Sequence, residues 1–394
     1  MKHVAVLFVA LVAGLACSPS AEESLPGGSA PRSPRQFLQN EDGSTLAVSA
    51  GETVYLSAIS PADTQAPIGD QTRSAMERLG AALQTAGLGY SQVVSCHVHL
   101  ADMESYADMN SVYGSFFSEG TYPARTTVEV PGLPEGAGVL LMCIGYRDAD
   151  GILVVRPPED EIPPAMGPYS PAVRAGNMVY LSGQGGRDPV TGELPDSAAG
   201  QAARTLETIG VILGAAGLEY ENAVQASTYF PPATDPASVT DAFGAIFSPG
   251  GAPSHSSVPL TRLPGDIAVE ITVLAAADNY ITRLFMHDEA PGSASSPASL
   301  TGGTAYSSAM PGDGNTFQEQ VRDAVSTQAE ALGLAFLGLP DVVRVVAYLY
   351  DLADLPELRA LLAEAFPEGV PALAAIQTHS PPGSMVSLEM IAVK

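Results

Sequence analysis

One pattern of residues occurs three times along this chain of 394 residues, and it restricts the possible folds more than any other feature. Each copy reads as an amphipathic helix, an apolar strand, a shorter amphipathic stretch and two closing strands. Copies of this kind predict three similar domains of ordinary size. The helical stretches span residues 71–90, 200–220 and 318–337, and the apolar strands after them are Val93–Leu100, Ala223–Phe230 and Val342–Leu349.

The helical stretches of the first two copies indicate which side of each helix is buried. Apolar residues recur every three or four positions, which places them on one face of a helix. Gly87 and Gly217 come just after the periodic runs, where a helix commonly ends on a left-handed residue. Each helix is therefore expected to pack through one stripe, formed by Met76, Leu79 and Leu83 in the first copy and by Leu206, Ile209 and Leu213 in the second.

Strand signals before and after the helices set the fold class. A hairpin opens each copy, with clear strands at Thr53–Ser57 and Asn177–Gly183 and a shorter one at Thr304–Ser308. Strands that come first and then alternate with helices predict an α+β fold, with a mixed sheet that carries two helices on one face. The predicted domains are residues 36–150, 151–278 and 279–394, and their closing strands lie at 125–130 and 138–146, at 255–260 and 267–275, and at 372–378 and 384–393.

The N-terminus predicts export. Residues 1–17 contain Lys2, then an apolar run too short to span a membrane, then Cys17, which is the layout of a lipoprotein-type signal peptide. Acylation of Cys17 would provide a lipid anchor, but Gly14 stands where such cleavage sites usually carry Leu, and ordinary secretion is the alternative. Residues 18–35 are expected to form a flexible tether. The protein is thus expected to be periplasmic or anchored to a membrane.

Charge and cysteine content narrow the partners. The net charge is −26, from 17 Lys and Arg against 43 Asp and Glu, and such a polyanion is repelled by phosphate backbones and anionic lipids. Nucleic acid is therefore not an expected partner. Beyond Cys17, only Cys96 and Cys143 are present, both in apolar strand-like runs. Burial without a bridge is the default expectation for them, and a single disulfide in an oxidising compartment is the alternative.

Several short motifs together resemble one known family. They are Gly167-Pro-Tyr-Ser170, Tyr180-Leu-Ser-Gly-Gln184, Ala86-Gly-Leu88, Asn110-Ser-Val-Tyr-Gly-Ser-Phe-Phe117 and the stretch from Pro123 to Val130. On these residues the chain resembles the Rid family, the RidA/YjgF-type enamine and imine deaminases, which have also been described as endoribonucleases. The resemblance implies chorismate-mutase-like domains that assemble as homotrimers, with ligand pockets between subunits. Three copies in one chain then imply a monomeric, intramolecular pseudo-trimer.

The resemblance also implies roles for individual residues. In this family an Arg holds the substrate carboxylate, a Glu orients or activates water at the imine carbon, and a Ser-Gly pair completes the pocket. Arg125 and Thr127 match the family pattern in the first copy, but the position fifteen residues beyond Arg125 is Leu140. In the second copy Glu270 holds that position, whereas His255 replaces the Arg. The second copy also supplies the matching pocket residues Tyr169, Ser182 and Gly183.

The third copy has lost both groups. It carries Leu373 at the Arg position and Leu388 at the Glu position, with Glu389 one residue further on. We therefore expect one composite site between the first and second copies, in which Arg125 and Glu270 act on a small 2-imino or 2-keto acid without metal or cofactor. The alternative is a non-catalytic small-ligand binding or scaffold protein of the cell envelope, in which all three clefts have degenerated.

Three other motifs give only weak evidence for a functional site. His97 and His99 project from one face of a strand, but no Cys or carboxylate lies at the spacing of a metal site. Ser254-His-Ser-Ser257 does not pair a nucleophile with a base, because adjacent residues of a strand point to opposite faces. Gly183-Gln-Gly-Gly186 lacks the fingerprint of a nucleotide-binding loop and is expected to form a turn.

Overall fold

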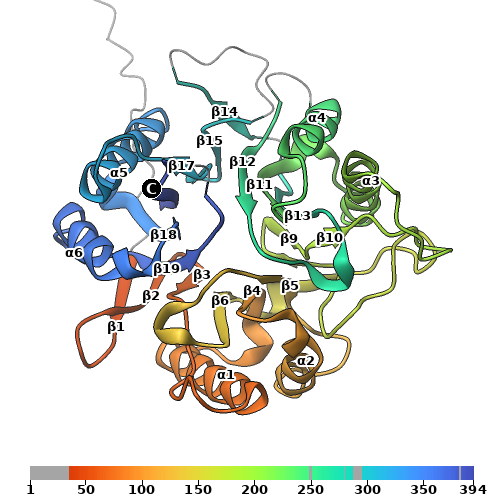
Figure 1. Cartoon of the computed structure of the whole chain (residues 1–394), viewed down its shortest axis with the longest axis horizontal. Coiled ribbons are helices and arrows are strands. Elements are labelled where there is room, and N and C mark those ends of the chain that lie inside the picture. The colour runs from red at the N-terminus through yellow and green to blue at the C-terminus, as the bar shows by residue number, and fades with distance from the viewer. Residues whose placement is uncertain (1–34, 248–250, 279, 287–294, 381–382) are drawn as a thin grey trace, which may run out of the picture. The chain divides into compact units, whose positions relative to one another are not determined.

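In the computed structural model, three β-sheets follow one another along the chain, and each sheet carries two helices on one face (Figure 1). The structure describes residues 35–247, 251–278, 280–286, 295–380 and 383–394. The predicted signal peptide, Cys17 and nearly all of the predicted tether therefore lie outside the described residues. The three sheets belong to one compact unit, Ser33–Lys394.

The elements of the three copies correspond one to one. The first copy contains β1 (Arg35–Gln39), β2 (Thr45–Ala50), β3 (Thr53–Leu56), α1 (Ile68–Thr85), β4 (Val93–Leu100), α2 (Tyr106–Gly114), β5 (Ala124–Glu129) and β6 (Val139–Tyr146). The second contains β7 (Ile152–Val155), β8 (Ala172–Ala175), β9 (Met178–Leu181), β10 (Gln184–Gly185), α3 (Ala198–Ala215), β11 (Ala223–Phe230), α4 (Pro236–Ile246), β12 (Ser254–Pro259) and β13 (Glu270–Ala276). The third contains β14 (Thr282–Leu284), β15 (Ala298–Thr301), β16 (Thr304–Ser307), β17 (Met310–Pro311), α5 (Phe317–Gly333), β18 (Val342–Leu349), α6 (Leu355–Ala365), β19 (Ala372–Gln377) and β20 (Val386–Val393).

The strands follow the same order in all three sheets. The first sheet runs β1-β2-β3-β6-β4-β5, and the second and third repeat it as β7-β8-β9-β13-β11-β12 and β14-β15-β16-β20-β18-β19. The pairs β4–β5, β11–β12 and β18–β19 are parallel, whereas the other neighbours are antiparallel. A parallel pair needs a crossover connection, which α2, α4 and α6 supply. The prediction of mixed α+β sheets is therefore confirmed.

The helices pack on their sheets through the residues that the periodicity indicates. Met76, Leu79 and Leu83 of α1 are fully buried against strands of the first sheet, and the corresponding residues of α3 are buried against the second. Gly87 and Gly217 both adopt a φ of 74°, the left-handed conformation expected after each helix. None of the helices in the described part of the chain combines the length and apolar character that a bilayer-spanning segment needs.

The sheet faces that carry no helices pack against one another. Val94, Val224 and Val343 hold corresponding positions of β4, β11 and β18, are fully buried, and belong to one apolar cluster to which all three sheets contribute, here called the central cluster. A small cavity of about 70 Å³, the central cavity, is lined by Arg344, Glu389 and residues of the other two sheets. Each sheet thus buries both faces, one under its helices and one against the neighbouring sheets.

The structure adds a further strand to the predicted opening hairpin of each copy, at the edge of the sheet. β1 and β2 precede β3, and β7 with β8 and β14 with β15 hold the same places in the other copies, so that each opening hairpin is part of a three-stranded meander. These strands are short and show little alternation of apolar and polar residues. Their register is set by the neighbouring strand, and sequence pattern alone therefore predicts them poorly.

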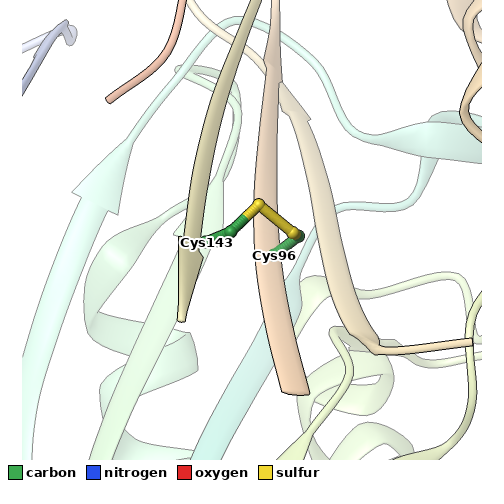
Figure 2. The surroundings of a disulfide bond; sticks show 2 residues. All are labelled: Cys96 and Cys143. Atoms are coloured by element: carbon green, nitrogen blue, oxygen red, sulfur yellow. A yellow bond between two sulfur atoms is a disulfide. The ribbon is translucent and has the colours of Figure 1, made fainter. Parts of the chain in front are cut away.

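The two cysteines of the first sheet form a disulfide, which corrects the expectation that they stay unbridged (Figure 2). The antiparallel register of β4 and β6 sets Cys96 directly opposite Cys143, with 4.1 Å between their Cα atoms. The two residues are 47 positions apart in sequence, and only the pairing of these strands brings them within bonding distance. The bond closes a loop that contains α2 and β5.

Candidate functional site

A cavity of about 230 Å³ lies between the first and second copies, and we call it the Arg125 cavity. The first copy contributes Arg125 and Thr127 from β5 and Tyr106 from the start of α2, whereas the second contributes Glu270 from the start of β13. A proline-rich segment before β8 and the loop after β10 complete the wall. Basic, acidic, hydroxyl and aromatic groups meet here, which makes this cavity the strongest candidate site in the described part of the chain.

The strand pairing of the first sheet explains where Arg125 and Thr127 lie. β5 is an edge strand that runs parallel to β4 and pairs Arg125 with Cys96. Side chains two residues apart on a strand share a face, so both residues reach the cavity. Arg125 is only 3% exposed, and its charge is therefore held inside the protein.

The guanidinium of Arg125 is held from several sides. Nη1 donates a hydrogen bond to Oδ1 of Asn110 (2.6 Å), and Nη2 donates one to the hydroxyl of Tyr106 (3.3 Å). The rings of Tyr113 and Tyr169 lie 5.1 and 5.3 Å from the guanidinium carbon, and aromatic faces stabilise a cation without consuming its donors. Because Arg has five N–H donors, some remain to bind a ligand carboxylate.

Hydrogen bonds between the copies fix the backbone of β5 at the cavity. The hydroxyl of Ser182 accepts the N–H of Arg125 (2.8 Å) and donates to the carbonyl of Ser170 (2.6 Å). The carbonyl of Arg125 accepts the N–H of Gly183 (3.1 Å). Ser182 is fully buried, so its hydroxyl joins two chain segments and does not face a ligand.

Glu270 is an acid whose surroundings favour its neutral form. Its carboxyl is buried, and burial raises its pKa to about 8, while the positive charge of Arg125 acts in the opposite direction. The protonated form therefore predominates at neutral pH, and the ionised form remains within reach. A pKa in this range suits a group that takes up and releases a proton during catalysis.

Glycine at position 183 leaves room for the carboxyl group of Glu270. A Cβ atom at Gly183 would overlap the carboxyl group of Glu270, so that any side chain there would push the acid out of place. The backbone of the Ser182-Gly183 pair therefore approaches Glu270 as closely as the chain allows. This close approach explains why glycine follows serine in the Ser-Gly motif of the second copy.

The hydroxyl of Thr127 is available for a ligand. Its Oγ1 is buried, and no hydrogen-bond partner is found for it among the described residues. A buried hydroxyl without a partner costs free energy of folding, on the order of 1–3 kcal/mol. A ligand that offered Thr127 a hydrogen bond would recover part of that cost.

The predicted site residues divide into those at the cavity and those elsewhere. Arg125, Thr127, Tyr169, Gly183 and Glu270 all line the Arg125 cavity. Ser182 lies directly behind them, through its hydrogen bond to the N–H of Arg125. Cys17 lies outside the described residues.

His255 does not join this group, contrary to expectation. It occupies in β12 the position that Arg125 holds in β5, but its ring stacks on Phe243 at a centroid distance of 4.0 Å. Its Nε2 lies 2.8 Å from Oγ1 of Thr228. Burial lowers the pKa of His255 to about 4, so that the imidazole is neutral and offers no cation to a substrate carboxylate.

The junction of the first and third copies carries no Arg–Glu pair. Strand register places Leu373 of β19 where β5 has Arg125, and Leu140 of β6 where β13 has Glu270. Both leucines line a groove of about 760 Å³. This groove is larger than the Arg125 cavity, but apolar side chains stand where the charged pair would be.

Glu389 does not restore an acid to the third copy. Ser387 is the residue that pairs with Tyr348, as Glu270 pairs with Tyr229, and therefore Ser387 holds the position that corresponds to Glu270. Glu389 lines the central cavity instead and accepts a hydrogen bond from the hydroxyl of Ser256 (2.6 Å).

Several residues of the site were missed by sequence reasoning. Tyr106, Asn110 and Tyr113 lie at i, i+4 and i+7 of α2, so one face of this helix meets Arg125, and that spacing was available in the sequence. Arg187 follows β10 in a loop, where no periodicity marks it. The described residues contain no group of three or more His, Cys, Asp or Glu that could hold a metal ion.

The sequence matches one known family in two segments. The family described as Endoribonuclease L-PSP matches residues 41–145 and 160–277. These segments lie in the first and second copies and together make up more than half of the chain.

Similar proteins have about the length of one copy. The 2-iminobutanoate/2-iminopropanoate deaminase of Escherichia coli (strain K12) is 36% identical over 118 residues, which are 29% of this chain and 92% of that protein. The mouse protein of the same name is 33% identical over 120 residues, which are 30% of this chain and 88% of that protein. Among solved structures, the YjgF gene product of E. coli is 36% identical and covers 30% of this chain and 95% of that one, with a TM-score of 0.29.

Proposed function

The chain belongs to the Endoribonuclease L-PSP family, and on that premise we propose that it is an imine or enamine deaminase acting on 2-imino acids in the Arg125 cavity. One observation carries the proposal: Arg125 and Glu270, each without its counterpart in its own copy, line the same cavity. Relatives named as 2-iminobutanoate/2-iminopropanoate deaminases support this reaction class.

Arg125 binds the carboxylate of the substrate. Its guanidinium is buried and oriented by Asn110 and Tyr106, and a planar guanidinium can meet both oxygens of a carboxylate. The binding of an anion also pairs a buried charge that contacts no acid among the described residues. Thr127 offers its hydroxyl to the same ligand.

Glu270 moves protons at the imine carbon. Its ionised carboxyl takes a proton from water as the water oxygen bonds to the carbon, and it passes this proton to the imine nitrogen, which gives an amino alcohol. It then transfers the hydroxyl proton to the nitrogen in the same way, the C–N bond breaks, ammonia leaves and a C=O bond forms. One water is consumed, and a 2-oxo acid and ammonia are released, so that the reaction balances without an oxidant or reductant.

The composite site requires that the three copies close on one another as an intramolecular pseudo-trimer of chorismate-mutase-like units. The central cluster supports this arrangement, because residues of all three sheets meet in it. The hydrogen bonds from Ser182 and Gly183 to the backbone of Arg125 support the pairing of the first copy with the second. The protein then functions as a monomer that contains its own subunit interfaces.

Export from the cytoplasm is part of the proposal. The disulfide between Cys96 and Cys143 supports it, since disulfides persist in oxidising compartments such as the bacterial periplasm. A lipid anchor at Cys17 would hold the protein at a membrane. Mass spectrometry of the mature N-terminus tests this, because an acylated Cys17 and a free N-terminus at a neighbouring residue have different masses.

The alternative function is non-catalytic binding of a small keto acid, or a scaffold role. It is supported by the junction between the first and third copies, where Leu140 and Leu373 replace the Arg–Glu pair. A nuclease role, which the family description evokes, is disfavoured by the net charge of −26.

The test is hydrolysis of 2-iminobutanoate, generated in the assay by an amino acid oxidase, with formation of 2-oxobutanoate as the readout. Glu270→Gln removes the proton carrier, and we expect kcat to fall by about 10²–10⁴-fold. Arg125→Met removes the carboxylate partner but keeps much of the apolar volume, and we expect kcat/KM to fall by about 10–100-fold. Circular dichroism confirms that both variants are folded.

Arg78→Ala is the matched control, because Arg78 is an exposed arginine that lines the other groove. It should retain the activity of the parent. Equal turnover by all three variants would refute the deaminase site. A parent protein that shows no turnover, but whose melting temperature rises with 2-oxobutanoate in an Arg125-dependent manner, would establish the binding function instead.

A further inference from the structure

A second arginine, Arg187, lines the Arg125 cavity from the loop after β10. Backbone carbonyls hold its guanidinium in place: Nη1 donates to the carbonyl of Gly192 (3.1 Å) and Nη2 to that of Gly265 (2.8 Å). These contacts orient the group without neutralising its charge. Since a guanidinium has five N–H donors, Arg187 is positioned in advance and still able to bind a ligand.

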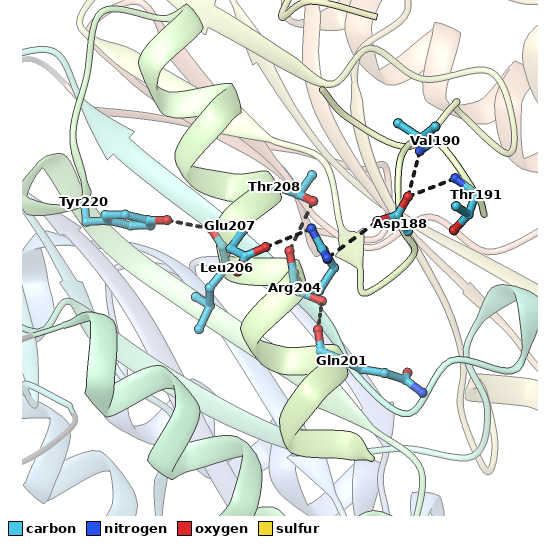
Figure 3. A network of polar contacts seen from close by, with 10 residues as sticks. Asp188, Val190, Thr191, Gln201, Arg204, Leu206, Glu207, Thr208 and Tyr220 are labelled. Carbon is cyan, nitrogen blue, oxygen red and sulfur yellow. Dashed lines mark hydrogen bonds and ion pairs between the residues drawn. The ribbon is translucent and has the colours of Figure 1, made fainter. Parts of the chain in front are cut away.

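The acid next to Arg187 in sequence is occupied by other partners. Asp188 also lines the cavity, but its Oδ2 lies 3.5 Å from Nη2 of Arg204 on α3. Its Oδ1 accepts the backbone N–H groups of Val190 and Thr191 at 2.9 Å each (Figure 3). These backbone N–H groups, more than Arg204, hold the pKa of Asp188 below its ordinary value, so this carboxylate is stabilised without Arg187.

A second nearby acid also has its own arginine. Oδ1 of Asp266 lies 2.8 Å from Nε of Arg262, and this hydrogen bond is the main reason why the pKa of Asp266 is lowered, while the charge of Arg187 has the smallest effect in the same direction. Among the described residues no carboxylate oxygen lies within 4.0 Å of the nitrogens of Arg187. Arg187 therefore brings a positive charge to the cavity that is not neutralised by a direct ion pair.

Two arginines without an ion pair line the same cavity. The absence of an ion pair is common among the described arginines, because only Arg35, Arg204, Arg262 and Arg322 have a carboxylate oxygen within 4.0 Å. What distinguishes Arg125 and Arg187 is that both line one cavity. A ligand with one carboxylate satisfies only one of them. A ligand with two satisfies both, and each carboxylate gains charge-assisted hydrogen bonds.

We propose that the substrates of the Arg125 cavity are dicarboxylic 2-imino acids, whose α-carboxylate binds Arg125 and whose side-chain carboxylate binds Arg187; this inference rests on the deaminase function proposed above. Arg187 is then the residue that determines specificity. The cavity wall also includes Met166 and Ile267, which can contact the methylene groups between the two carboxylates.

The orientation of the substrate follows from Glu270. The Glu270 carboxyl lies directly against Gly183, whose N–H donates to the carbonyl of Arg125 (3.1 Å), and so the proton carrier lies near Arg125. The reacting C=N bond, which is adjacent to the α-carboxylate, therefore lies at the Arg125 end. The second carboxylate extends toward Arg187, away from the bond that is hydrolysed.

The experiment compares substrates of equal reactivity but different charge. 2-Iminosuccinate and 2-iminoglutarate, generated from aspartate and glutamate by amino acid oxidases, are measured beside 2-iminobutanoate with the full chain. We expect the parent to show a higher kcat/KM for at least one of the dicarboxylates. In Arg187→Gln, kcat/KM for that substrate should fall about 10–100-fold more than kcat/KM for 2-iminobutanoate, through an increase in KM.

Arg322→Gln is the control, because Arg322 lies on α5, pairs with Glu364 and does not line the cavity. It should leave the substrate preference unchanged. A parent that prefers 2-iminobutanoate, or an Arg187→Gln variant that affects all substrates equally, would overturn the proposal while the deaminase function stood.

A thermal-shift measurement separates this proposal from the proposed reaction. Oxaloacetate and 2-oxoglutarate, the corresponding 2-oxo acids, should raise the melting temperature more than 2-oxobutanoate does, and Arg187→Gln should abolish the difference. If no imino acid is hydrolysed but this difference is observed, the deaminase function fails and the dicarboxylate site remains. If the three 2-oxo acids act alike, the dicarboxylate site is refuted.

Discussion

At the scale of the single residue, Glu270 is subject to two opposing influences on its proton. Burial between two copies disfavours the carboxylate, whereas the positive charge of Arg125 favours it, and burial dominates. Such a group couples the stability of the fold to pH. The same property that makes Glu270 a suitable proton carrier therefore carries a measurable cost for the folded state.

Glu270→Gln should remove this pH dependence. The pKa of Glu270 is about 8 in the folded protein against an ordinary value of 4.5, so its contribution to stability is fully present below about pH 4.5 and is lost as the pH rises to 8. The variant, which cannot ionise, should match the parent at acidic pH and become more stable than it above pH 8, by an amount on the order of a few kcal/mol.

Urea denaturation of both proteins from pH 4.5 to pH 9 measures the effect. The free energies of unfolding should diverge through this interval and then run parallel. If the difference between the two proteins does not change with pH, Glu270 is not buried as the structure has it.

Single residues of the site could be predicted only in part. Arg125 and Glu270 follow from motif and spacing, and the structure places both at one cavity. His255 was misjudged, because its stacking on Phe243 depends on a helix packed above the strand. Arg187 could not be found at all, since only the folding of its loop against the carbonyls of Gly192 and Gly265 turns it toward the cavity.

At the scale of the element, the ends of the helices show that different residue types occupy the same left-handed position. The residue that closes α1 and α3 is a glycine with positive φ, but Phe336 holds the corresponding position after α5, with a φ of 58°. A residue with a side chain is strained in this conformation. Burial of the ring does not offset this strain, because Phe336 is 94% exposed.

Phe336→Gly should therefore stabilise the protein. The strain of a left-handed residue is about 1–2 kcal/mol, and the greater freedom of glycine in the unfolded chain offsets part of this, which leaves a gain of about 0.5–1 kcal/mol. Chemical denaturation measures the change. Phe336→Ala is the control, because it removes the ring but keeps the strained Cβ, and it should be close to neutral; an equal gain in both variants would assign the effect to the ring.

The disulfide between β4 and β6 should contribute to stability through the loop that it closes. Replacing both Cys96 and Cys143 by Ala is expected to lower the free energy of unfolding by about 2–4 kcal/mol, because the 47-residue separation is then free in the unfolded chain. Denaturation curves of the parent with and without reductant, and of the double variant, measure the effect. Coincidence of all three curves would contradict it.

Long elements could be predicted better than short ones. β4, β11 and β18 are apolar runs of eight residues and were found at their observed bounds. Short strands such as β8 and β15 were not, because four residues carry too little pattern and depend on neighbouring strands for their hydrogen bonds. The disulfide could not be predicted for the same reason, since it follows from the register of β4 and β6 and not from local sequence.

At the scale of the whole molecule, the three copies share the central cluster and should unfold together. Val224 is fully buried in this cluster, and Val224→Asp places an unpaired charge there, which destabilises by several kcal/mol. We expect differential scanning calorimetry to show one transition for the parent and one, at lower temperature, for the variant.

Val190→Asp serves as the control, because this valine is 81% exposed and should change the transition little. Two separate transitions, of which only one responds to Val224→Asp, would mean that the copies fold independently.

The arrangement of the copies could be predicted from the repeats only up to a point. The repeats predicted three similar units with mixed α+β sheets, and the structure has three such sheets, whose common strand order was not predicted. Which residues face each other across a junction depends on how whole sheets pack, and no local pattern encodes that. Sequence alone could therefore not establish that Arg125 and Glu270 line the same cavity.

The central cavity shows that three copies joined in one chain can carry different residues at corresponding positions. Ser95, Gln225 and Arg344 hold corresponding positions of β4, β11 and β18, and all three line it. In an assembly of identical subunits each mutation appears in triplicate, so an arginine here would bring three like charges together in a space of about 70 Å³. A single polypeptide escapes that constraint. One polypeptide can therefore carry a substitution in the central cavity in one copy without repeating it in the other two.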